Sequence, residues 1–246
     1  MSEIINTFLI GLFFGTFGTT IGGIIGIVIN KNSNRFLSCI LSLASGLMIS
    51  VVCFDLIPEA MNLSNIMDVL IGILFGIFIM MICDMFVQKK IGNKIKTSKN
   101  TLLKTGIIVS VGLAIHNFPE GLAIGSGFDA SIILGYSLAI AICMHDIPEG
   151  VSMAIPMKNG GMSKLKVIIY VILSGVTTGI GAFLGAIVGG VSQSLIAICL
   201  SFSAGAMLYI VSGELIPESN KLYSGKWSAI ANMVGIILGL IAINIK

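Results

Sequence analysis

The chain has 246 residues, of which 56% are hydrophobic and only 10% are charged, with a formal net charge of +3. Soluble domains carry about 25% charged residues, so this composition and the mean hydropathy of +1.05 argue against a soluble enzyme or nucleic-acid-binding domain. We therefore expect an integral membrane protein with a single transmembrane domain over residues 1–246, no organic cofactor and no nucleic-acid partner.

Apolar stretches of about 20 residues, the length that crosses a bilayer, predict eight membrane-spanning helices. They lie near residues 4–29, 36–60, 66–88, 102–127, 131–156, 165–190, 194–219 and 227–245. Residues 4–30 contain no ionisable side chain, a run too long for the core of a signal peptide, so we interpret it as the first span. Within the later uncharged run, Gly189-Gly190 and Ser192-Gln193-Ser194 predict the turn between the sixth and seventh spans.

Basic residues follow the first, third, fifth and seventh predicted spans. They are Lys31, Arg35, Lys89, Lys90, Lys94, Lys96, Lys99, Lys104, Lys158, Lys164, Lys166, Lys221 and Lys226. Only Lys246 falls on the other side of the membrane in this arrangement. Because cytoplasmic loops of membrane proteins are enriched in Lys and Arg, we expect a multi-pass protein of the cell membrane with both termini outside the cytoplasm.

The first three predicted spans, residues 4–88, resemble the last three, residues 165–245. Asp55-Leu56-Ile57-Pro58-Glu59 matches Glu214-Leu215-Ile216-Pro217-Glu218, and Gly46-Leu47-Met48 matches Gly205-Ala206-Met207. An odd number of spans separates the two copies, so their orientations in the membrane are opposite. With the central pair at residues 102–156, the chain predicts a 3+2+3 arrangement of inverted repeats, an architecture typical of secondary transporters.

Two similar hexapeptides lie in the central pair of spans and contain both histidines of the chain. They are His116-Asn117-Phe118-Pro119-Glu120-Gly121 and His145-Asp146-Ile147-Pro148-Glu149-Gly150. In each, histidine and glutamate are spaced i,i+4 and share a helix face, whereas Asn117 and Asp146 point about 100° away and can serve a neighbouring second site. Ionisable groups inside a span mark functional sites. Imidazole and carboxylate ligands suit Zn²⁺ and tolerate Fe²⁺, Mn²⁺ or Cd²⁺.

Four further carboxylates lie at the ends of the second and seventh predicted spans. They are Asp55, Glu59, Glu214 and Glu218. By the symmetry of the repeats, one pair lies near each mouth of the protein. They either attract cations at an entrance and an exit or are solvated helix ends beside Pro58 and Pro217, and the sequence favours neither. Met48 is likewise either a packing residue or a soft thioether ligand.

The paired HNFPEG and HDIPEG motifs, the eight spans and the external termini resemble the ZIP (Zrt/Irt-like) metal transporters, most closely their prokaryotic, broad-specificity branch. The resemblance covers essentially the whole chain and implies uptake of divalent metal, chiefly zinc, by a homodimer. It implies that His116, Glu120, His145 and Glu149 hold the primary metal, with Met48 approaching it. It also implies that Asn117 and Asp146 join the bridging Glu120 and Glu149 at a second metal position. It also implies an elevator-like slide of spans 1, 4, 5 and 6 against spans 2, 3, 7 and 8.

The chain departs from the family pattern at two places. Many relatives carry Glu-Pro in the sixth span, where this chain has Thr178-Gly179, so we expect one strongly held metal per chain instead of two. Relatives also often have a histidine-rich connection between the third and fourth spans. Here that connection is rich in lysine and lacks histidine, which removes a metal-receiving role for it.

Two other classes of function compete with a carrier. An intramembrane metal-dependent hydrolase would need a motif such as HExxH, which is absent, and both hexapeptide glutamates are assigned as ligands, so we do not expect an enzyme. A metal-gated channel or a metal sensor is the remaining alternative. The inverted repeat favours alternating access over a fixed pore.

Overall fold

The computed structural model describes residues 2–28, 33–87 and 101–244, and these residues form helices joined by short connections, with no β-strand among them. The helices are α1 (Ser2–Val28), α2 (Asn34–Val51), α3 (Ile57–Leu63), α4 (Ile66–Val87), α5 (Thr101–Ala130), α6 (Ile132–Asn159), α7 (Lys164–Gly189), α8 (Gln193–Ile210), α9 (Ile216–Leu222) and α10 (Lys226–Asn244). The all-α prediction is therefore confirmed. Residues 29, 88 and 245, at the ends of three predicted spans, lie outside the described residues, as do Lys31 and the lysines of residues 88–100.

Within the described ranges, six helical segments are long and apolar enough to cross a membrane. They are Glu3–Val28, Asn34–Leu63, Ile66–Phe86, Ile132–Asn159, Lys164–Gly189 and Gln193–Leu222. The apolar part of α10, Lys226–Ile241, is shorter than these segments. The first hexapeptide lies in α5. These lengths and compositions fit a multi-pass membrane protein.

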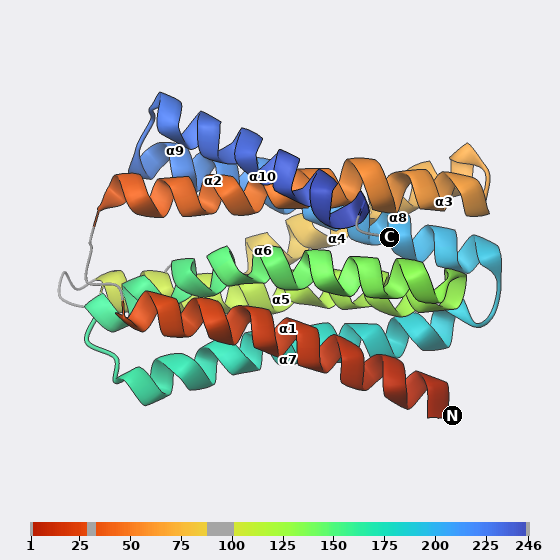
Figure 1. Cartoon of the computed structure of the whole chain (residues 1–246), viewed down its shortest axis with the longest axis horizontal. Helices are drawn as coiled ribbons and strands as arrows, with labels where there is room; N and C mark the ends of the chain where they lie inside the picture. The colour runs from red at the N-terminus through yellow and green to blue at the C-terminus, as the bar shows by residue number, and fades with distance from the viewer. Residues whose placement is uncertain (1, 29–32, 88–100, 245–246) are drawn as a thin grey trace.

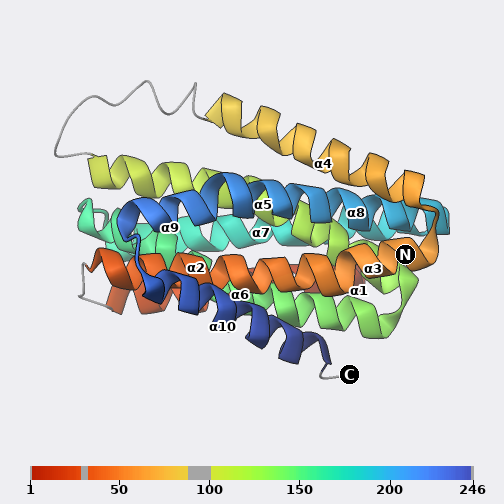
Figure 2. The same ribbon diagram turned by 90° about the horizontal axis from the view of Figure 1, so that it is seen from above.

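The helices are arranged in two layers (Figure 1). One layer contains α1, α5, α6 and α7; in it, α1 packs against α6 and α7, and α5 packs against the same two helices. The other layer contains α2, α3, α4, α8, α9 and α10, with α10 against α2 and α4 against α8. Seen from above, α4 and α10 lie at opposite edges of the bundle (Figure 2). The layers meet mainly where α5 packs on α8 and α2 packs on α6.

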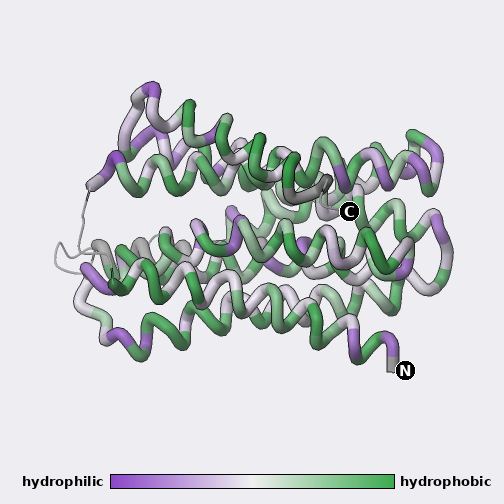
Figure 3. Tube along the Cα trace, in the orientation of Figure 1, coloured by the Kyte–Doolittle hydropathy of each residue, from purple (hydrophilic) through white to green (hydrophobic). Residues whose placement is uncertain are grey.

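Charge is distributed unequally between the two ends of the bundle. Hydrophilic positions collect at the ends, and hydrophobic positions dominate along the helices (Figure 3). The end where α2, α7 and α10 begin carries Arg35, Lys164 and Lys226. The opposite end, where α1 begins and α5 ends, carries Glu3 and Asp129. The basic end is the one that the sequence assigns to the cytoplasm.

Glycine pairs allow close helix crossings within the second layer. A Cβ atom on Gly46 or Gly235 would overlap a backbone carbonyl oxygen of the facing helix, so α2 and α10 approach with their backbones nearly in contact. The same holds for Gly76 and Gly205 where α4 crosses α8. Since Gly46 corresponds to Gly205 and Gly76 to Gly235 in the internal repeat, the two crossings are equivalent. Both depend on the absence of a side chain.

Two continuous helical rods of the second layer, α2–α3 and α8–α9, each contain an LIPE sequence. Each rod also contains a π-helical turn. The turns are η1 (Val52–Leu56), between α2 and α3, and η4 (Val211–Leu215), between α8 and α9. The Ile57 amide donates to the carbonyl of Val52, and the Ile216 amide donates to that of Val211. A proline follows directly in each rod and lacks a backbone N–H. The local irregularity near Pro58 and Pro217 is a widened turn that ends two residues before each proline.

A cluster of buried hydroxyl groups and one half-buried amide joins α2, α9 and α10. This serine cluster consists of Ser38, Ser42, Ser45, Ser219, Ser228 and Asn232. Ser38 Oγ lies 2.9 Å from Ser219 Oγ and 2.7 Å from Ser228 Oγ. Asn232 Nδ2 donates to the carbonyl of Ser42 at 3.2 Å and to Ser45 Oγ at 2.8 Å. These polar groups therefore bond to one another and to the backbone, as buried groups require.

Candidate metal centre

The two hexapeptides lie on α5 and α6, which pack against each other in the first layer. Pro119 and Pro148 both lie inside helices that continue past them. The glycines that end the hexapeptides explain how neighbouring helices approach so closely: a Cβ on Gly121 would overlap the Thr178 carbonyl of α7. A Cβ on Gly150 would overlap the Thr19 carbonyl of α1. The first motif is thus packed closely against α7 and the second against α1.

Three of the predicted ligands come together between α5 and α6. Glu120, His145 and Glu149 have 0% exposed surface, and one ligand atom of each lies within 4.8 Å of those of the other two. His145 Nε2 is 2.8 Å from Glu120 Oε1, a hydrogen-bond distance. One imidazole and two carboxylates form the mixed nitrogen and oxygen ligand set that Zn²⁺ accepts. The cluster is therefore a candidate metal centre.

Asn117 and Asp146, predicted for a second position, are also fully buried. Asp146 Oδ1 lies 3.8 Å from His145 Nε2, beyond hydrogen-bond range. Asn117 Nδ2 donates to the carbonyl of Ser174 on α7 at 3.0 Å, which fixes the orientation of the amide. Among the described residues, Asn117 Oδ1 and Thr178 Oγ1 are buried oxygens without a hydrogen-bond partner. Buried oxygens of this kind are available to a water molecule or a cation.

The structure does not describe the side chain of His116, although its backbone belongs to α5. Met48, the predicted soft ligand, is fully buried on α2, the helix that packs against α6 from the second layer. Its packing role is plain, because it belongs to the main hydrophobic core with Ile142 and Met207.

The four outer carboxylates occupy unlike environments. Asp55 lies in η1 and is buried, with 5% of its surface exposed. Glu59 and Glu214 are half-buried. Glu218 is exposed and accepts a hydrogen bond from Lys221 Nζ at 3.3 Å. Of the two readings that the sequence leaves open, a solvated helix end describes Glu218, whereas Asp55 is not solvated.

One contact near the candidate centre is not predicted from the sequence. Ser203 of α8 donates a hydrogen bond from Oγ to the carbonyl of Pro119, with a separation of 2.6 Å. This bond joins the two layers directly beside Glu120. A serine in an apolar helix most often bonds to its own backbone, as Ser203 also does to Cys199 at 2.9 Å. The sequence therefore does not indicate that Ser203 also donates to the Pro119 carbonyl of another helix.

The charge of the centre favours a cation. Glu120, Asp146 and Glu149 together carry three negative charges when ionised, and the two hexapeptides supply only two imidazoles. Even with both imidazoles protonated, negative charge would remain. Burial of an uncompensated charge is costly, and a divalent ion would offset that cost while accepting the same oxygen and nitrogen ligands.

Similarity to known proteins includes both hexapeptides and covers the whole chain. A model of the ZIP zinc transporter family matches residues 88–245, which include both hexapeptides. A zinc transporter ZupT of Clostridium perfringens is 31% identical, over 100% of this chain and 96% of that protein. A ZupT of Corynebacterium aurimucosum is 31% identical, over 90% of this chain and 91% of that protein. A zinc transporter GufA of Myxococcus xanthus is 33% identical over 57% of this chain and 56% of that protein.

Proposed function

This chain belongs to the ZIP zinc transporter family, and on that premise we propose that it carries divalent metal, chiefly Zn²⁺, across the cell membrane into the cytoplasm. The observation that carries the proposal is the fully buried group of Glu120, His145 and Glu149 between two adjacent helices, α5 and α6. Fe²⁺, Mn²⁺ and Cd²⁺ are further substrates, because imidazole and carboxylate ligands tolerate them. Membership of a transporter family favours a carrier over an enzyme.

We assign the primary metal to Glu120, His145 and Glu149, with His116 as a fourth ligand. The internal symmetry of the hexapeptides supports His116, since it occupies in α5 the position that His145 occupies in α6. Met48 approaches this site from α2 during the transport cycle. A soft thioether is a weak ligand for Zn²⁺, so we give it a secondary part in binding.

The second metal position is expected to bind its ion more weakly than the first. Asn117, Asp146 and Thr178 supply it with one carboxylate, one amide oxygen and one hydroxyl, and the unpartnered oxygens of Asn117 and Thr178 support a role in binding. Because neutral oxygens attract a divalent cation less than a carboxylate does, one tightly bound metal per chain is expected. Calorimetry on the purified protein tests this, and two equally tight sites would contradict it.

The route to the centre runs past the outer carboxylates. Asp55 and Glu59 face the outer mouth in this proposal, and Glu214 and Glu218 face the inner one. The burial of Asp55 supports a direct part in the path, whereas the exposure of Glu218 supports a role in attracting ions at the surface. Both termini are external in this orientation, which the basic end of the bundle supports.

Alternating access arises from a slide of one layer past the other. In the proposed 3+2+3 arrangement, α1, α5, α6 and α7 carry the metal, and the layer of α2, α3, α4, α8, α9 and α10 remains fixed. The arrangement of the helices in two layers supports this division. Ser203 and the Pro119 carbonyl would separate during the slide, since they belong to different layers. Resemblance to the family supports a homodimer.

Uptake of radiolabelled Zn²⁺ into proteoliposomes tests the assignment. Glu120→Ala and Glu149→Ala are expected to abolish uptake, and Glu3→Ala is the matched control, because Glu3 is an exposed carboxylate at the start of α1. Undiminished uptake in both site variants would refute the centre. Saturable uptake with exchange of internal for external zinc is expected of a carrier. Flux that rises linearly with zinc concentration would favour the alternative of a metal-gated channel, and binding without flux would favour a sensor.

A further inference from the structure

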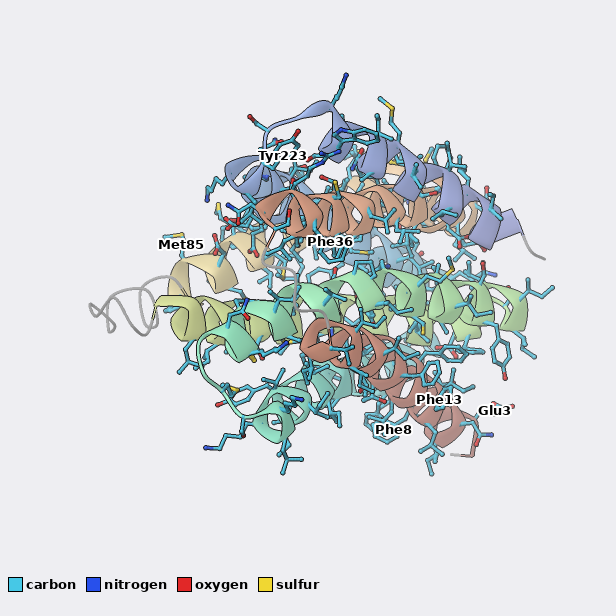
Figure 4. All side chains as sticks on the ribbon, turned by 60° about the vertical axis from the view of Figure 1, so that its left-hand side comes forward. Glu3, Phe8, Phe13, Phe36, Met85 and Tyr223 are labelled. Atoms are coloured by element: carbon cyan, nitrogen blue, oxygen red, sulfur yellow. The ribbon has the colours of Figure 1, made fainter. Side chains whose placement is uncertain are left out.

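Arg35, in the first turn of α2, lies between two aromatic rings. Its guanidinium carbon is 4.8 Å from the centroid of the Trp227 ring and 5.8 Å from that of the Tyr223 ring. Figure 4 shows Tyr223 on the segment between α9 and α10, beside the beginning of α2. Contact with aromatic faces orients the guanidinium plane and leaves the N–H groups at its edge available for an acceptor.

The charges around this arginine are mostly positive. Lys221 and Lys226 are exposed on the same segment, and Lys221 is paired with Glu218. Among the residues that the structure describes, no ion pair involves Arg35 or Lys226. Both α2 and α10 begin at this end, so the positive ends of two helix dipoles add to the two cations. The location therefore suits an anion.

An apolar stripe leads away from this location along α10. Trp227 is 45% exposed, and Ile230, Val234, Ile237 and Ile241 follow it at intervals of three or four residues, each between 41% and 55% exposed. Residues at these intervals lie on one face of a helix. The stripe therefore runs from the aromatic and basic end toward the middle of the membrane.

We propose that Arg35, Trp227, Tyr223 and Lys226 bind the headgroup phosphate of an anionic phospholipid, whose acyl chain lies along the α10 stripe. Arg and Trp are the side chains expected where headgroups meet hydrocarbon. A free phosphate ion would use the cations but would gain nothing from the stripe, whereas a phospholipid uses both. The site goes beyond metal transport and involves none of the metal ligands.

The internal repeat allows this site to be compared with the corresponding positions in the other half of the chain. The positions that correspond to Arg35, Tyr223 and Trp227 in the other half are Ser194, Ser64 and Asp68. Ser64 and Asp68 bond to each other near the start of α4, and no cation or aromatic ring replaces those of the first site. The lipid site is therefore specific to one end of the bundle. It attaches α2 and α10, and hence the layer that contains them, to one leaflet.

Native mass spectrometry of the full-length protein in detergent tests the proposal with phosphatidylglycerol and phosphatidylcholine of identical acyl chains. Arg35→Gln is expected to weaken phosphatidylglycerol binding about tenfold, the loss of one charge-assisted hydrogen bond. Trp227→Leu should weaken it about threefold through loss of the cation–π contact. Lys164 is an exposed cation at the same end and has no aromatic partner among the described residues. Lys164→Gln should therefore change binding less than about twofold, well below one charge-assisted bond.

Phosphatidylcholine has the same phosphate but no net charge, so its binding is expected to be weaker than that of phosphatidylglycerol and to change less in every variant. Retained phosphatidylcholine binding verifies that the variants fold, and Arg35→Lys should retain part of the preference for phosphatidylglycerol. Equal phosphatidylglycerol binding by the wild type and Arg35→Gln would overturn the site. An equal loss in Lys164→Gln would mean diffuse attraction and would also overturn it. Displacement of the lipid by millimolar inorganic phosphate would identify a phosphate site in its place.

Discussion

Two buried polar regions of this protein differ in how their polar groups are balanced. The serine cluster between α2, α9 and α10 contains hydroxyl and amide groups without net charge, and they donate to and accept from one another. The candidate metal centre between α5 and α6 contains Glu120, Asp146 and Glu149 around His145, all with 0% exposed surface. The first region is complete as a hydrogen-bonded structure. The second carries charge that suits a cation.

This difference separates a structural role from a chemical one. Neutral hydrogen-bonded groups hold helices together at little cost when every partner is present. Buried carboxylates in excess of imidazoles cost stability in the absence of a cation. We therefore expect substitutions in the serine cluster to lower stability with little effect on transport. Substitutions in the metal centre should do the reverse.

The largest effect is expected for Glu149→Gln. Loss of one carboxylate ligand should lower zinc uptake by about 100-fold or more, since even supporting groups around a metal are worth 10–100-fold. The thermal midpoint of the metal-free protein should stay the same or rise, because one buried negative charge is removed. Uptake into proteoliposomes and a thermal melt in detergent measure the two quantities. A lower midpoint together with normal uptake would reverse the roles of the two regions.

The next effect concerns the backbone approach that supports the metal centre. Gly121→Ala would force α5 away from α7, because its Cβ overlaps the Thr178 carbonyl, and should destabilise the protein by roughly 1–3 kcal/mol. Gly112→Ala on the same helix is the control: among the described residues, its Cβ would have only Glu214 Oε2 near it, at 3.9 Å. Thermal melts of the two variants provide the measurement. Equal midpoints would show that the close crossing is not required.

A smaller effect is expected for Ser219→Ala in the serine cluster. Ser219 Oγ lies 2.9 Å from Ser38 Oγ and 2.6 Å from Ser42 Oγ, and its removal leaves both hydroxyls with fewer partners. The expected loss is about 1–2 kcal/mol of unfolding free energy. Zinc uptake per folded molecule should remain within about twofold of the wild type, a difference well under 1 kcal/mol. A tenfold fall in uptake would mean that the cluster takes part in transport.

The smallest effect is expected for Ser201→Ala, the repeat counterpart of Ser42. In that half of the molecule the other positions of the cluster are apolar: Ala197, Ala204, Ala60, Val69 and Ile73. Ser201 Oγ bonds to the Ala197 carbonyl of its own helix at 2.7 Å, so no bond between helices is lost. The change in unfolding free energy should be within about 0.5 kcal/mol, measured alongside Ser219→Ala. Equal losses in the two variants would remove the distinction between the halves.

The sequence predicts the helical class and the family, and both are confirmed. It also anticipates that Glu120, His145 and Glu149 come together, because i,i+4 spacing fixes a helix face and the motif occurs twice. The resemblance to the family implies the same division of spans as the two layers. The residues alone do not, since α4 is apolar on all sides and such a helix has no face that indicates its neighbour. The sequence does not predict the serine cluster either. Serine is ordinary in membrane helices, and its partners lie more than 170 residues apart in the chain.

The π-helical turns set a limit on how the length of the chain can vary. A π-turn accommodates one residue more than an α-helical turn, so a deletion within residues 52–56 would restore a regular helix without turning Glu59 to another face. A deletion elsewhere in the rod would rotate everything beyond it by about 100°. The proline makes the first change unfavourable as well, because a regular turn would bring Pro58 against the preceding carbonyl. A one-residue deletion within the turn is therefore expected to be tolerated better when the proline that follows it is replaced as well, in either half of the molecule.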